Sequence, residues 1–212
     1  MAALSEPERR AAFLLRLRAA GVRDLQVLRA MEAVPRSLFF PGVDPETALR
    51  DIVLPLPGGQ AAERPSWLAL GLEALGVQPG QRVLEVGTGS GYVTALLTRM
   101  GARVTSLDRR RLLVETAGKR LAALGLVPEA LACADFAAHP VPAGSFARIV
   151  IHIALAAPPA RLFAALEPEG RLLFTTDARP RRLMLVRVAA EGLAVLDVGA
   201  STAITAAGGL SS

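Results

Sequence analysis

The residues best placed to do chemistry surround three glycines, at positions 87, 89 and 91. A short apolar run over 83–86 comes directly before them and is typical of a buried strand, while residues 91–100 predict a helix. Glycine at every second position permits a turn so tight that its backbone N–H groups face whatever lies above the strand end. The sequence therefore predicts the ligand-binding corner of a doubly wound α/β sheet.

The spacing of these glycines narrows the class of ligand. A dinucleotide-binding turn has the pattern G-x-G-x-x-G, which requires a small residue where this chain has Tyr92. A Walker phosphate loop ends in Gly-Lys-Ser/Thr, and no lysine stands here. The pattern that is present, E-x-G-x-G-x-G from Glu85 to Gly91, resembles motif I of the class I S-adenosylmethionine-dependent methyltransferases.

Two carboxylates follow later strands of the same predicted sheet. Asp108 ends a short β-like run at 103–107, and Asp135 closely follows another at 130–133. Plainer roles are a helix N-cap for Asp108 and a turn residue for Asp135. Their place at the carboxyl ends of strands favours ligand binding, because a carboxylate there can accept both ribose hydroxyls of a nucleoside. The resemblance implies that Asp135 receives the adenine amino group, with Phe136 beside the ring.

A proline-punctuated stretch at 34–66 carries a more specific resemblance. Its motif residues are Val34-Pro35-Arg36, Phe39-Phe40-Pro41, Asp51, Leu54-Pro55, Gly59-Gln60 and Pro65. They are similar to the V-P-R-x-x-F-x-P, Asp, Leu-Pro and G-Q-T-I-S-Q-P segments of the protein-L-isoaspartate O-methyltransferases. The resemblance extends over roughly residues 27 to 187. It implies methyl transfer from S-adenosylmethionine to the free carboxylate of an isoaspartyl residue in damaged protein.

That reaction depends on positioning more than on proton transfer. A carboxylate oxygen is already nucleophilic at pH 7, so the enzyme has to align it with the methyl group and exclude water. The cofactor-binding residues that the resemblance implies are Gln60, Glu85, Gly87, Thr88, Gly89, Gly91, Asp108, Arg109, Asp135 and Phe136. No metal is expected, because the two histidines are too few and too far apart for a zinc site.

The chain departs from the family pattern where the methyl acceptor would lie. Ala61 and Glu63 stand at the Thr and Ser positions of the family, and His152 replaces a small hydroxyl residue. Glu63 would repel a carboxylate substrate unless Arg64 neutralised it or took over carboxylate binding. If Glu63 and His152 share one pocket, they are candidate catalytic groups for an acceptor with a proton to lose, a hydroxyl or an amine.

Plainer interpretations of both residues stay open. Glu63 can form a surface ion pair with Arg64 or be an acid at a helix N-terminus, and His152 can be a satisfied strand-end histidine. The protein can then be a divergent relative that methylates a small molecule or RNA, or an inactive paralogue that only binds the cofactor. The sequence leaves the methyl acceptor open.

The composition limits the partners. Of 212 residues, 52% are hydrophobic and 20% charged, which excludes a disordered chain. Arginines gather at 109–111 and around Pro180 in a chain of net charge +5, but aromatic residues make up only 4%. Nucleic-acid surfaces normally combine cations with stacking residues, so solvated arginine clusters are favoured over weak RNA contact. Cys133 lies in an apolar run and is expected to be buried.

Nothing in the sequence points to a membrane. It has neither a cleavable N-terminal signal nor an apolar span of about 18 residues. We therefore expect a soluble, cytoplasmic monomer whose partner is an isoaspartyl-containing protein or peptide.

The elements that must position these residues alternate regularly after Pro65. Helices are expected at 66–75, 91–100, 111–124 and 158–166, strands at 82–86, 103–107, 130–133, 147–153 and 170–176, and a hairpin over 182–198. Two further helices, at 6–20 and 24–31, precede the looped stretch. The predicted fold class is α/β: a doubly wound Rossmann-like methyltransferase sheet, mostly parallel, with a C-terminal antiparallel hairpin and an N-terminal helical and looped cap. The predicted divisions are a cap at 1–66, a cofactor-binding domain at 67–204 and a loose tail at 205–212.

Overall fold

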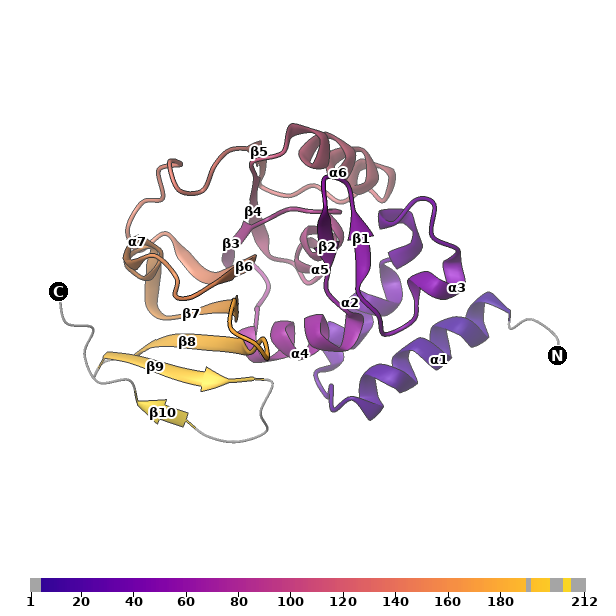
Figure 1. Cartoon of the computed structure of the whole chain (residues 1–212), viewed down its shortest axis with the longest axis horizontal. Helices are drawn as coiled ribbons and strands as arrows, with labels where there is room; N and C mark the ends of the chain where they lie inside the picture. Colours follow the sequence, from indigo (N-terminus) through magenta and orange to yellow (C-terminus); the bar gives the residue numbers. More distant parts are fainter. Residues whose placement is uncertain (1–4, 190–191, 199–203, 207–212) are drawn as a thin grey trace.

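The computed structural model describes residues 5–189, 192–198 and 204–206 (Figure 1). Its helices are α1 Glu6–Ala19, α2 Leu25–Ala33, the 3-10 helix η1 Arg36–Phe39, α3 Pro45–Ala48, α4 Pro65–Leu75, α5 Tyr92–Arg99, α6 Arg111–Ala123 and α7 Ala160–Ala164. Its strands are β1 Leu54–Leu56, β2 Gln60–Ala62, β3 Arg82–Val86, β4 Arg103–Asp108, β5 Ala130–Cys133, β6 Phe146–Leu155, β7 Leu166–Thr176, β8 Leu183–Ala189, β9 Gly192–Asp197 and β10 Ile204–Ala206. None of these described helices has both the length and the apolar character that a bilayer span requires.

Eight strands form one sheet in the order β10-β9-β8-β7-β6-β3-β4-β5. The pairs from β5 to β7 are parallel, and those from β7 to β10 are antiparallel. The predicted fold class is thereby confirmed. The chain runs outward from β3 to β5 and then returns to β6 on the other side of β3, so a crevice forms at the carboxyl ends of β3 and β6. The predicted tail begins inside β10, and residues 207–212 lie outside the described residues.

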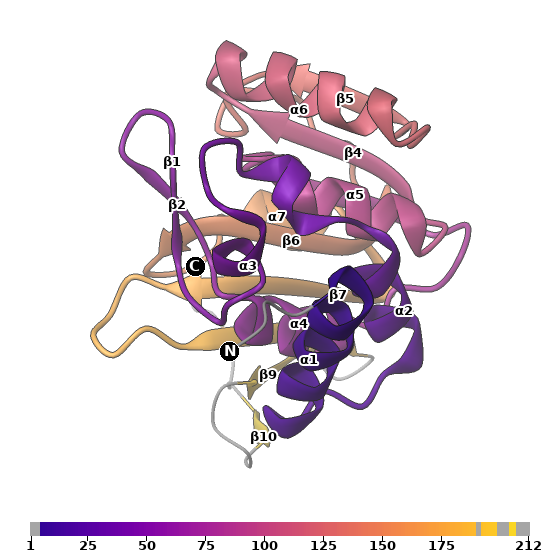
Figure 2. The same ribbon diagram turned by 90° about the vertical axis from the view of Figure 1, so that its right-hand side faces the viewer.

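Alternate residues of the central strands face two separate apolar cores. Val83 and Val150 pack on one face, in the core that contains residues of α1, α2, α4 and α5. Leu84 and Ile149 pack on the other face, in the core that contains Leu162 of α7. Figure 2 shows the N-terminal helices gathered in front of the sheet. Because both faces are covered, the strands are near-continuous apolar runs, which is why they could be recognised in the sequence.

The stretch at 34–66 is more ordered than the sequence indicated. It contains η1, α3 and an antiparallel hairpin of β1 and β2, in which Leu54 pairs with Ala62 and Leu56 with Gln60. Figure 2 shows this hairpin standing out from the body of the sheet. Pro55 lies in β1, and a proline is tolerated there because the sheet has only two strands, both of them edges. The hairpin has no clear apolar periodicity because its strands are only three residues long and three of their six residues are exposed.

For the strand β5, the sequence pattern predicted the bounds correctly but not the burial of its last residue. Its bounds match the prediction, but Cys133 is exposed, so the prediction that it is buried was wrong. β5 is the last strand at one side of the sheet and has a neighbour, β4, on one side only. An apolar run at such an edge is covered less completely than the same run in a central strand.

The strand β6 is irregular where it reaches the crevice. Ile151 pairs with Phe174 and Ala154 with Thr175, so His152 and Ile153 are two extra residues in β6. The pairing of β6 with β3 also ends at Ile151. Neither extra residue therefore has a partner in the ladder, and such a bulge re-aims the side chains that it contains.

Candidate functional site

The glycine turn after β3 has the backbone geometry that its sequence predicts. Gly87, Gly89 and Gly91 all have positive φ angles, of 97°, 55° and 87°. A Cβ atom on Gly89 would lie 3.3 Å from Leu56 Cδ1 of the hairpin, and one on Gly91 would lie 2.7 Å from the Cβ of Ala117 in α6. Gly89 thus keeps open the space between turn and hairpin, whereas Gly91 allows α6 to pack closely.

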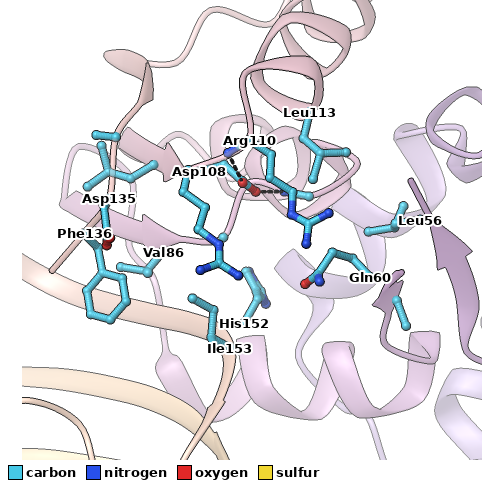
Figure 3. A pocket seen from close by; sticks show the side chains of 16 residues that line it. Leu56, Gln60, Val86, Asp108, Arg110, Leu113, Asp135, Phe136, His152 and Ile153 are labelled. Carbon is cyan, nitrogen blue, oxygen red and sulfur yellow. Dashed lines mark hydrogen bonds between the residues drawn. The ribbon is translucent and has the colours of Figure 1, made fainter. Parts of the chain in front are cut away.

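The carboxylate of Asp108 is tied to this turn. It is 9% exposed, and its Oδ2 accepts a hydrogen bond from the backbone N–H of Gly89 at 3.0 Å. Its Oδ1 accepts from the N–H of Arg110 at 2.9 Å (Figure 3), and because Arg110 is the N-cap of α6, Asp108 does not have the N-cap role considered for it. Each carboxylate oxygen retains a free lone-pair direction after these bonds. Asp108 can therefore fix the turn and still accept from a ligand hydroxyl.

A cavity of about 240 Å³ lies above the turn and gathers most of the predicted cofactor residues. Those that line it are Gln60, Gly87, Gly89, Asp108, Arg109, Asp135 and Phe136. Figure 3 shows Asp135 and Phe136 on the opposite side of the cavity from Gln60 and Leu56. The Oδ1 of Asp135 accepts from the N–H of Ala137 at 2.9 Å, so this residue also has the turn role considered for it.

Three of the predicted residues lie behind this cavity instead of in its wall. Glu85 is fully buried, and its Oε2 accepts from the hydroxyl of Thr94 at 2.5 Å. Thr88 is buried with its hydroxyl 2.7 Å from that of Ser106. Gly91 packs against α6, as described above. Through these buried contacts, Glu85, Thr88 and Gly91 stabilise the position of the turn without lining the cavity.

Glu85 also has a partner in β6. His152 Nε2 lies 3.2 Å from Glu85 Oε1, and the imidazole is about one quarter exposed. The donor in this hydrogen bond depends on the imidazole tautomer: when Nε2 carries the proton it donates to Glu85, and the other ring nitrogen, Nδ1, then has a lone pair available. His152 is thus both a satisfied strand-end histidine and a residue of the cavity wall, which Figure 3 shows beside Ile153.

A second cavity adjoins the first and brings the two candidate catalytic residues together. Both Glu63 and His152 line it, and it shares Gln60, Ala61, His152 and Ile153 with the cofactor cavity. The sequence left open an ion pair between Glu63 and Arg64, which was wrong. Arg181 Nη1 lies 3.6 Å from Glu63 Oε1 instead, and the Arg64 guanidinium stacks over the ring of Trp67 at 5.5 Å.

The backbone carbonyl of Glu63 is bound by Arg36, which was noted in the sequence only as part of a motif. Arg36 is 1% exposed, and it donates to the carbonyls of Ala48 at 2.5 Å and Glu63 at 3.2 Å. Its guanidinium lies 4.6 Å from the centre of the Phe40 ring. Burial lowers the pKa of Arg36, and burial also raises the pKa of Tyr92, over whose ring the same guanidinium lies.

Two further arginines act at the site without having been predicted there. Arg110 donates to the carbonyl of Gly58 at 2.7 Å and thereby links the start of α6 to the tip of the hairpin. Arg181 reaches Glu63 from the connection between β7 and β8. Both belong to arginine clusters that the sequence analysis assigned to solvent, and only contacts between distant segments reveal their roles. Among the described residues, no group of three or more metal-ligating side chains is present.

Sequence comparison places the chain in a family. A model described as protein-L-isoaspartate(D-aspartate) O-methyltransferase matches residues 8–204. The protein-L-isoaspartate O-methyltransferase 2 of Rhodopseudomonas palustris is 38% identical over 188 residues, which cover 89% of this chain and 87% of that protein. The protein-L-isoaspartate O-methyltransferase of Azorhizobium caulinodans is 42% identical over 185 residues, which cover 86% of this chain and 85% of that protein.

Solved structures show the same fold. A protein-L-isoaspartate O-methyltransferase superposes with a TM-score of 0.75 at 24% identity, covering 94% of this chain and 66% of that one. A Plasmodium falciparum protein described by the same name, solved with S-adenosyl-L-homocysteine, gives a TM-score of 0.74 at 20% identity over 88% of this chain and 92% of that one. With the family model and the bacterial relatives, the conclusion is that this chain belongs to the protein-L-isoaspartate O-methyltransferase family.

Proposed function

We propose that this protein transfers a methyl group from S-adenosylmethionine to the free carboxylate of isoaspartyl residues in damaged protein. One observation carries the proposal: the glycine turn and Asp108 border a cavity that shares four lining residues with a second, charged cavity. Such a pair of adjoining cavities fits a cofactor and an acceptor that must meet. Family membership supports the same reaction.

The residues around the first cavity fit an adenosyl group. Positive φ angles at Gly87 and Gly89 let the backbone approach a ligand without side chains in the way. Asp108 would accept from the ribose hydroxyls, and Asp135 with Phe136 would receive the adenine. Arg109 and Gln60 complete the wall. We infer that Glu85, Thr88 and Gly91 support the cofactor indirectly, through the shape of the turn.

The second cavity suits an anionic acceptor. Glu63 alone would repel a carboxylate, but Arg181 pairs with it, and Arg64 adds a further positive charge to the lining. The three charges sum to +1. The side chain of Arg181 is 61% exposed and that of Glu63 is 34% exposed, so their pair contributes only about 0.2–1 kcal/mol. The net positive charge of these three side chains offsets the repulsion that the sequence raised against a carboxylate acceptor.

The reaction requires the protein mainly to place the acceptor carboxylate next to the methyl group of the cofactor. When bound, S-adenosylmethionine supplies a methyl group on a positively charged sulfur; transfer forms an O–C bond to the acceptor carboxylate, and the C–S electron pair stays on sulfur. No proton moves, so neither His152 nor Glu63 is required as a base. The hairpin, which Arg110 fixes to α6, and the bulge at His152 and Ile153 would exclude water from the meeting point.

A second acceptor class is favoured by one specific observation. His152 is hydrogen-bonded to the buried Glu85, an arrangement that suits a general base. It would serve a hydroxyl or amine acceptor, from which a proton must be removed. This alternative predicts that activity depends on His152, whereas carboxylate methylation does not.

Two measurements test the proposal. Titration calorimetry with S-adenosylhomocysteine should show binding, and labelled methyl transfer should reach a peptide with one isoaspartyl residue but not its aspartyl counterpart. Binding without transfer to the isoaspartyl peptide would contradict the proposed acceptor and leave the cofactor assignment standing.

We also propose that the protein acts as a monomer, which gel filtration would test. We place its activity in the cytoplasm, where this cofactor is available.

A further inference from the structure

The second cavity is closed on one side by an ion pair between segments that are far apart in the chain. Glu63 lies between β2 and α4, and Arg181 lies between β7 and β8. Both residues line the cavity, and their charged atoms are 3.6 Å apart. Each side chain is long and partly exposed, so the pair can open without movement of the strands.

The backbone of Glu63 is held by contacts that do not involve its side chain. Its carbonyl accepts from the buried Arg36, and the hairpin behind it is paired over three residues of each strand. Opening of the pair is therefore a change of side-chain rotamers, with Glu63 anchored at its main chain. Arg181, on the more exposed connection, is the partner that is free to turn toward a ligand.

The other arginines nearby are less suited to bind a ligand. The guanidinium of Arg64 stacks on the ring of Trp67. Arg182 is not among the residues that line the cavity, and it pairs with Asp197 at 3.0 Å. Arg36 is buried and already donates to two carbonyls. Among the described arginines, Arg181 alone combines a place in the lining with a carboxylate partner that an incoming anion can replace.

We propose that Arg181 binds the carboxylate of the methyl acceptor, and that Glu63 is a resident counter-ion which this carboxylate displaces. The inference rests on the proposed function and assigns the specificity-determining residues of its acceptor cavity. In this chain the pair takes the place of the hydroxyl residues that Ala61 and Glu63 replace. A guanidinium can hold one oxygen of a carboxylate while the other remains free to attack.

The same exchange distinguishes substrate from product. Methylation forms the O–C bond and removes the negative charge of the acceptor, so the ester no longer competes with Glu63 for Arg181. Glu63 then returns to Arg181, and the ester leaves. A fixed cation without a counter-ion would bind the substrate more tightly but would also leave an uncompensated charge in the empty cavity.

The test measures peptide binding independently of turnover. An isoaspartyl peptide, and the same peptide with that carboxylate replaced by a neutral carboxamide, are titrated into the protein saturated with S-adenosylhomocysteine. Arg181→Gln should weaken binding of the carboxylate peptide by about tenfold or more and abolish the preference over the carboxamide. Glu63→Gln should tighten binding of the carboxylate peptide by about threefold or more, because Arg181 loses its competitor.

Arg182→Gln is the matched control, since it removes the neighbouring arginine from outside the cavity lining. It should change both dissociation constants by less than about twofold, as expected for an exposed pair. The double variant Glu63→Gln/Arg181→Gln should bind the carboxylate peptide better than Arg181→Gln alone, because the unpaired Glu63 no longer repels it. Unchanged S-adenosylhomocysteine affinity in all variants confirms that they are folded.

The outcomes separate this inference from the proposed function. If the wild-type protein methylates the peptide but Arg181→Gln keeps its preference for the carboxylate, the inference is wrong and the function stands. If the wild-type protein neither binds nor methylates the isoaspartyl peptide, the proposed function fails and the inference fails with it.

Discussion

The cofactor cavity and the acceptor cavity share a wall but are built in different ways. The first is made by the ends of buried parallel strands, and its key contacts involve backbone groups, such as the N–H of Gly89 with Asp108. The second is made by connections and a small hairpin, and its key contact joins two partly exposed side chains, Glu63 and Arg181. Cofactor binding is therefore tied to the core of the fold, whereas acceptor choice depends on side chains that can change without disturbing it.

The largest expected effect is on the cofactor side, in Gly89→Val. The φ angle of 55° is strained for any residue with a side chain, and a Cβ atom would lie 3.3 Å from Leu56, so the larger valine has to intrude on the space between the turn and the hairpin. We expect S-adenosylhomocysteine affinity to fall by at least about 1,000-fold, or about 4 kcal/mol. Calorimetry measures this loss.

The control for that substitution is Gly42→Val. Gly42 has a φ angle of 91° but open space around a Cβ atom, so it carries the backbone strain of about 1–2 kcal/mol without a contact at the site. Equal loss of affinity in both variants would show that strain alone, and not the cavity, explains the result.

Arg36→Met tests whether the buried arginine behind the acceptor cavity stabilises the fold. The substitution removes the donors to the carbonyls of Ala48 and Glu63. Because hydrogen bonds from charged groups contribute about 1.5–3 kcal/mol each, partly offset by lower desolvation, we expect the free energy of unfolding to fall by about 2–3 kcal/mol. Urea unfolding measures it, with the exposed Arg50→Met as control. An unchanged free energy of unfolding would mean that the hairpin needs no anchor.

Asp108→Asn should have an intermediate effect on the cofactor side. One amide oxygen can replace only one of the two acceptors that Gly89 and Arg110 use. We expect about tenfold to thirtyfold weaker binding of S-adenosylhomocysteine. Asp135→Asn, at an exposed position, should weaken it by less than about fivefold. The reverse ranking would mean that Asp135, after β5, contributes more to cofactor affinity than Asp108 at the end of β4.

His152→Gln should have the smallest effect. Glutamine can still donate a hydrogen bond toward Glu85, and a carboxylate acceptor needs no base. The rate of isoaspartyl peptide methylation should therefore change by less than about threefold, in contrast to the 10²–10⁴-fold that a general base contributes. A loss of about 100-fold or more would favour the hydroxyl or amine acceptor instead.

The two cavities also differ in how far the sequence predicts them. The strands, the glycine turn and both acids at strand ends follow from local patterns, because buried parallel strands are continuous apolar runs and a tight turn demands glycine. The bounds of β3 and β5 match residue for residue. The hairpin of β1 and β2 was missed, because a short two-stranded sheet has no such pattern.

The partner of Glu63 could not be predicted for a different reason. Sequence reasoning chose the adjacent Arg64, but the chain enters α4 there with Arg64 as the N-cap, and its side chain turns onto Trp67. Arg181 becomes a neighbour because the connection from β7 to β8 lies at the carboxyl end of β7, the same end of the sheet at which the parallel strand β6 reaches the cavities. Contacts of this kind depend on the assembled topology. The burial of Glu85 could not be predicted either, because its place in the motif does not indicate whether its side chain lines the cavity or points into the protein.

The bulge in β6 has a consequence for how this fold diversifies. His152 and Ile153 contribute to the walls of both cavities but to no strand pairing. Exchanging Ile153 therefore leaves the sheet register unaltered, whereas a residue at position 152 must still donate a hydrogen bond to the buried Glu85 to keep the cofactor turn as it is. Natural drift, or a directed library that varies position 153 freely and keeps a hydrogen-bond donor at position 152, can explore new methyl acceptors while the rest of the scaffold keeps its stability.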